Sequence, residues 1–99
     1  MPATALEKYQ ALQAHLEHLL ATRDRCERKI RALDAAWNQH PYFEGNRPSR
    51  ATLGREDERL CEVRMRDAWE EQLRRVAAEM DALAPAVDAE DRAARRAAA

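Results

Sequence analysis

Residues 5–37 read ALEKYQALQAHLEHLLATRDRCERKIRALDAAW, and this stretch decides the fold. Its apolar side chains recur at alternating steps of four and three residues, with one charged interruption at Arg23. Such spacing keeps the side chains on one face of an α-helix and is typical of a coiled-coil seam. The predicted seam consists of Ala5, Tyr9, Leu12, Leu16, Leu19, Arg23, Cys26, Ile30, Leu33 and Trp37.

The first helix is predicted over residues 5–39. Thr4 and Glu7 have the spacing of a capping box, in which the hydroxyl of the first accepts from the backbone amide of the second. Pro41 restricts His40 to extended geometry, so the helix should end before it. A loop is predicted over residues 40–50, because two prolines and the pair Gly45-Asn46 interrupt any helix there.

The second helix is predicted over residues 51–84 and should end at Pro85, which has no amide hydrogen to donate. Residues 85–99 are small or charged, with Val87 as the apolar anchor, and are predicted to form a short helix or a flexible tail. Residues 1–84 therefore form one helical hairpin. Stretches rich in Val, Ile and Thr are missing from the sequence, so no strands are predicted.

The composition fits this class of fold. The 99 residues are 35% charged with a formal net charge of −1, and they include only two glycines. We predict an all-α protein, an antiparallel two-helix hairpin of coiled-coil type. Neither a leader peptide nor a window of about eighteen apolar residues is evident, so no membrane partner and a cytoplasmic location are expected. The Ala- and Arg-rich composition suggests a bacterial source.

Antiparallel pairing about a turn centred between residues 44 and 45 tests the hairpin. It places Ile30 opposite Leu60 and Arg23 opposite Asp67, a pair that would hold the register. The row of Leu60, Val63 and Asp67 does not continue smoothly into the apolar residues that follow. We therefore predict an offset in the seam of the second helix.

Two helices alone should leave apolar surface exposed, and burial in a lone hairpin barely offsets the entropy of ordering it. A homodimer that forms a four-helix bundle is the predicted remedy. The residues expected to dimerise are Met65, Trp69, Leu20 and Cys61. The second cysteine, Cys26, lies in the seam, and both thiols are expected to be buried and reduced.

The loop and its flanks concentrate aromatic and arginine side chains. Residue types of this kind dominate the binding energy of many interfaces. One reading is a protein-binding tip, and the other is that the rings close the open end of the bundle. The residues concerned are Trp37, Tyr42, Phe43, Arg47 and Arg50.

A basic face is the main alternative for binding. Arg25, Arg28 and Lys29 can share one solvent-facing side of the first helix, as in helical proteins that bind nucleic-acid backbones. The structural alternative is an ordinary charged flank whose side chains pair within the hairpin.

No arrangement of catalytic side chains is suggested by spacing. His15 and His18 lack the motif of a metal site, so neither metal, cofactor nor small-molecule substrate is predicted. We expect a non-enzymatic protein-interaction module that binds itself and another protein, as an adaptor, assembly factor or secretion-type chaperone. The alternative is a nucleic-acid-binding regulatory protein that uses the basic face.

Overall fold

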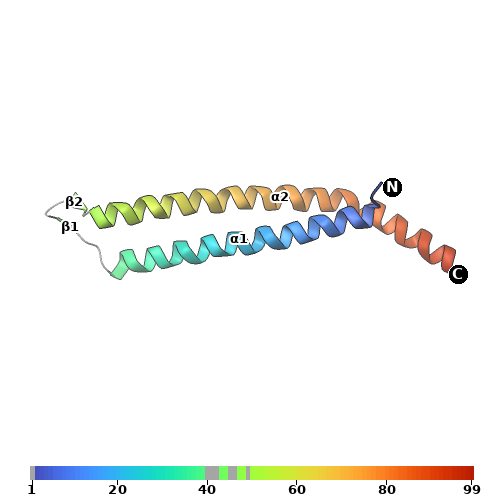
Figure 1. Ribbon diagram of the computed structural model, residues 1–99, viewed down its shortest axis with the longest axis horizontal. Coiled ribbons are helices and arrows are strands. Elements are labelled where there is room, and N and C mark those ends of the chain that lie inside the picture. The colour runs from blue at the N-terminus through green and yellow to red at the C-terminus, as the bar shows by residue number, and fades with distance from the viewer. Residues whose placement is uncertain (1, 40–42, 45–46, 49) are drawn as a thin grey trace. The chain divides into compact units, whose positions relative to one another are not determined.

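The computed structural model describes residues 2–39, 43–44, 47–48 and 50–99, with side chains for 2–35 and 53–99. The chain is an all-α hairpin of two long helices, α1 (Ala5–Gln39) and α2 (Arg50–Ala98). Between them lie two short strands, β1 (Phe43–Glu44) and β2 (Arg47–Pro48), as Figure 1 shows. The predicted fold class is confirmed at this level.

The seam predicted for α1 is confirmed. Each of its members with a described side chain is buried or half-buried, including the charged Arg23. Leu19 is 1% exposed, and Cys26 and Ile30 are also buried. The alternation of four and three residues therefore marks the face of α1 that is covered by α2.

The start of α1 is capped from two directions. The backbone amide of Glu7 donates to the Thr4 hydroxyl over 3.1 Å, which confirms that half of the predicted capping box. The amides of Ala5 and Leu6 donate to the two carboxylate oxygens of Glu90, over 2.7 and 3.1 Å. A carboxylate at a helix N-terminus also faces the positive end of the helix dipole. The end of α2 thus stabilises the beginning of α1.

The expected end of the second helix is wrong. α2 does not stop at residue 84 but continues through Pro85 to Ala98. A proline inside a helix removes one hydrogen bond and bends it, but the flanking segments here are rich in alanine, the strongest helix former. In Figure 1 the red end of α2 departs in direction from the orange part before it. Half-buried Val87 and the Glu90 cap give this last segment tertiary contacts.

The absence of strands is also corrected. β1 and β2 pair antiparallel, with Phe43 opposite Pro48 and Glu44 opposite Arg47. Only two residues of each strand take part, so the pair joins the helices without adding a core.

The hairpin divides into two compact units. The terminal unit combines Met1–Leu20 with Glu71–Ala99, and the middle unit is Ala21–Glu70. In each unit a segment of α1 packs against an antiparallel segment of α2. Ala5 meets Glu90 in the terminal unit, whereas Lys29 meets Glu58 in the middle unit. The two units differ in what holds their helices together.

Candidate functional site

The seam of α2 runs without interruption. One row of buried and half-buried positions, spaced alternately by four and three residues, runs along the helix, as one does in α1. Those in the terminal unit are Leu73, Val76, Met80, Leu83 and Val87, and those in the middle unit are Arg55, Arg59, Glu62, Arg66 and Trp69. One half of the seam is therefore apolar, and the other half is mostly charged.

The predicted offset in this seam is therefore wrong. Leu60 is 42% exposed and Asp67 is exposed too, so neither belongs to the buried row. Arg23 does not pair with Asp67, because it donates to its neighbour Asp24 over 3.0 Å. Asp67 accepts instead from Arg66 over 3.1 Å. Helix geometry selects the seam positions, and the long apolar stems of arginine can occupy them while their charged ends reach the edge.

Ion pairs join the two helices of the middle unit. The Lys29 ammonium lies 3.2 Å from a Glu58 carboxylate oxygen and 3.1 Å from one of Glu62. Arg59 donates to Asp34. Glu27 accepts from Arg66 over 3.4 Å, and Arg66 also contacts Asp67. Acidic and basic side chains thus alternate across this part of the interface.

Glu62 is the most buried charged group in these pairs, with only 13% of its side chain exposed. Burial raises the pKa of the Cys26 thiol, and a hydrogen bond to Glu62 raises it further. Hydrogen bonds to Glu62 and Glu58 raise the pKa of Lys29. The Lys29 ammonium and the Cys26 thiol are therefore both held in their protonated forms around the carboxylate of Glu62.

Several large apolar side chains lie outside the seam. On α2, Leu53 and Leu60 are exposed and stand seven residues apart, so they share a face of the helix that half-buried Val63 continues. We call these three residues the outer stripe. On α1 in the terminal unit, Leu6 and Leu20 are exposed beside the seam. Repetition on one helix face is the pattern by which one helix receives another.

The residues predicted to dimerise have different environments. Met65 and Leu20 are 48% and 36% exposed, and Cys61 is an exposed free thiol. Trp69 is half-buried at a seam position of the middle unit. The expectation that both thiols are buried is wrong for Cys61 and confirmed for Cys26, and both are free.

The predicted basic face is partly occupied. Lys29 faces two carboxylates of α2, so its charge is balanced within the hairpin. Arg25 donates to the Thr22 hydroxyl over 3.3 Å, and Arg28 is exposed. Two of the three cations therefore remain directed to solvent.

The predicted tip lies outside the described side chains. The backbone places Trp37 near the end of α1, Phe43 in β1, Arg47 in β2 and Arg50 at the start of α2. Tyr42 lies outside the described residues altogether. Its role and that of its neighbours stay a prediction.

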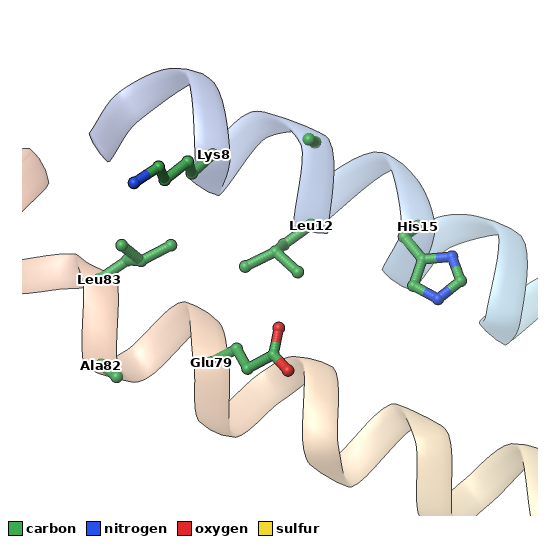
Figure 2. A pocket seen from close by; sticks show the side chains of 7 residues that line it. Lys8, Leu12, His15, Glu79, Ala82 and Leu83 are labelled. Carbon is green, nitrogen blue, oxygen red and sulfur yellow. The ribbon is translucent and has the colours of Figure 1, made fainter. Parts of the chain in front are cut away.

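A groove of about 620 Å³ lies between α1 and α2 in the terminal unit. Figure 2 shows Lys8, Leu12 and His15 on α1 and Glu79 and Leu83 on α2 lying toward the space between the helices; Ala11 and Ala82 complete the lining. Its floor contains the half-buried seam residues Leu12 and Leu83, and the exposed Lys8, His15 and Glu79 line its α1 and α2 edges. We call it the terminal groove. The seam predicted from the sequence includes Leu12, but its spacing gives no sign of an open flank beside that residue.

In the part of the chain that the structure describes, no three His, Cys, Asp or Glu side chains gather in a way that could hold a metal ion. No helix within the same residues combines the length and the apolar character needed to cross a bilayer. Comparison of the chain with protein-family models, curated proteins and solved structures finds no match.

Proposed function

We propose that the chain is a non-enzymatic protein-interaction module: a helical hairpin that associates with itself in a four-helix bundle and binds another protein. Its role would be that of an adaptor, an assembly factor or a secretion-type chaperone in the cytoplasm. Architecture alone carries no function, so the proposal depends on surfaces.

The outer stripe is the observation that supports this proposal best. Leu53 and Leu60 place large apolar side chains in water on the same face of α2, in a chain of which 35% of the residues are charged. An amphipathic helix from a partner recognises such a stripe by laying its own apolar face along it. Val63 extends the stripe to the edge of the seam, so a docked helix would also shield the hairpin itself.

Capture from cells of the source organism tests the proposal. The tagged chain should retain a partner, and Leu53→Gln with Leu60→Gln should lose it, because glutamine keeps helix propensity and removes the apolar contact. Asp57→Gln with Arg64→Gln, two exposed changes on the same helix segment, is the matched control and should retain it. Equal capture by both double variants at unchanged helicity would contradict the proposal.

The tip is tested in the same assay. Replacing Tyr42 and Phe43 by alanine should reduce capture if the tip binds a partner. A lower melting temperature with unchanged capture would instead assign the rings to closing the end of the bundle.

Nucleic-acid binding through Arg25, Arg28 and Lys29 is the alternative outcome. It would appear as capture that is lost after nuclease treatment and that weakens steeply as salt rises. An apolar contact on the outer stripe should survive both treatments.

A further inference from the structure

We infer that the terminal groove is the docking site of a second copy of this chain, which places its own groove against it with α1 of each copy over α2 of the other. The inference rests on the self-association proposed above and specifies where and how it occurs.

The edges of the groove carry opposite charges. Lys8 and His15 stand on the α1 edge, and Glu79 stands on the α2 edge; all three are exposed. Lys8 lies beside Leu83 (Figure 2), and it forms no ion pair with Glu79 within the chain. Each edge is therefore available to an opposite charge from outside.

A two-fold axis parallel to the helices satisfies both edges at once. It exchanges α1 for α2 across the interface and leaves every residue at its own height along the bundle. The α1 edge of each copy then meets the α2 edge of the other. Because heights are kept, Glu79 of the second copy also lies one helical turn from Lys8, so each Lys8 ammonium gains a second carboxylate at that distance. Each helix also becomes antiparallel to both of its neighbours, which is the usual arrangement of an up-down four-helix bundle.

The floor of the groove suits a helix. Ala11 and Ala82 are small and exposed, so a second pair of helices can approach closely, while Leu12 and Leu83 are half-buried and would complete their burial. A two-fold pairing buries both grooves in one contact and leaves no apolar floor exposed.

Exchange of charge between two variants tests this inference. Lys8→Glu and Glu79→Lys each create two like-charge contacts in a homodimer and should each weaken it by roughly tenfold. When the two variants are mixed, both contacts become attractive, so a heterodimer of wild-type affinity should form. Sedimentation equilibrium gives the affinities, and native mass spectrometry identifies the mixed species by mass.

Arg74→Glu and Asp81→Lys are the matched controls, because they make the same charge changes at exposed positions of α2 that do not line the groove. They should leave the affinity within about twofold of wild type. Circular dichroism of each variant checks its helicity. If a reversed charge lowers helicity, Lys8→Gln and Glu79→Gln replace it, and each should weaken the dimer by roughly threefold.

The outcomes separate this inference from the broader proposal. A dimer whose affinity is unchanged by either reversal, or a mixture that fails to recover affinity, would move the interface elsewhere while self-association stands. A wild-type chain that stays monomeric at 100 µM or more would overturn both. If an apolar dye binds the terminal groove of such a monomer, the groove is a binding site for a small ligand, and this result would also overturn the inference.

Discussion

Replacing Glu62 by leucine should stabilise the protein, which is an unusual expectation for removing a charge that makes an ion pair. Glu62 occupies a seam position of the middle unit with 13% of its side chain exposed. A buried ion pair contributes little when the cost of removing both charges from water nearly equals their attraction. A leucine at the same position would instead complete an apolar seam.

The size of the effect follows from burial. Burying a leucine side chain contributes about 1.5–3 kcal/mol, and most of this should be realised at a position so well covered. Losing the contact with Lys29 should cost only about 0–1 kcal/mol, because that ammonium is half exposed and keeps Glu58 as a partner. Leucine and glutamate have similar helix propensity, so the backbone contributes no difference. The net gain should be about 1–2 kcal/mol, or very roughly 4–15 °C in melting temperature.

Glu58→Leu is the matched control. It removes the other carboxylate that contacts Lys29, but 49% of that side chain is exposed, so the change should stay within about 0.5 kcal/mol of wild type. Urea unfolding at one protein concentration measures both variants. Circular dichroism follows the helicity, and the fluorescence of Trp37 and Trp69, which both belong to the middle unit, follows the unfolding of that unit. If Glu62→Leu lowers the stability by more than Glu58→Leu does, the charged seam is a net source of stability and our reasoning is refuted.

Three further expectations concern the seam, the cap and the thiols. Leu19→Ala should lower the free energy of unfolding by about 2–5 kcal/mol and Leu20→Ala by less than about 1 kcal/mol, since the first side chain is 1% exposed and the second 36%. Equal losses for the two variants in urea unfolding would contradict the assignment of Leu19, and not Leu20, to the buried seam. Glu90→Ala should cost about 1 kcal/mol by removing the cap of α1, with a loss that shrinks in high salt, and a neutral result would mean that the last part of α2 does not hold that cap in solution. Cys26 is buried and its pKa is raised, so its reactive thiolate forms only at higher pH than usual. At pH 8, iodoacetamide should therefore modify the exposed Cys61 at least roughly tenfold faster than Cys26, as followed by mass spectrometry. Similar rates for the two thiols would show that the middle unit opens readily.

Much of the fold was present in the spacing of residues. The row from Ala5 to Leu33 predicted which face of α1 is buried, and Thr4 predicted the start of the helix, because both signals arise from local helix geometry. The charged half of the α2 seam carried the same signal. Counting back from Leu73 by four and three reaches Glu62 and Arg59, but a search for apolar residues passes over them.

The remaining errors have separate physical causes. A proline such as Pro85 usually ends a helix, but the alanine-rich flanks together with the tertiary contacts of Val87 and Glu90 explain why α2 continues beyond it. The short strand pair could have been suspected from Gly45-Asn46, a dipeptide typical of tight hairpin loops. The predicted pair of Arg23 with Asp67 failed because a long side chain can reach the next residue on its own helix as easily as the facing one.

The sequence by itself determined that this protein is two helices, each with one buried edge. The spacing of the residues along that edge depends only on the 3.6 residues per helical turn and on the hydrophobic effect, which removes apolar side chains from water. The tertiary structure alone decided which charges meet across the hairpin, that the end of α2 caps the beginning of α1, and that an open groove with opposite charges on its edges lies in the terminal unit. These features join residues far apart in the chain, so their distances depend on how the helices pack and leave no trace in local spacing.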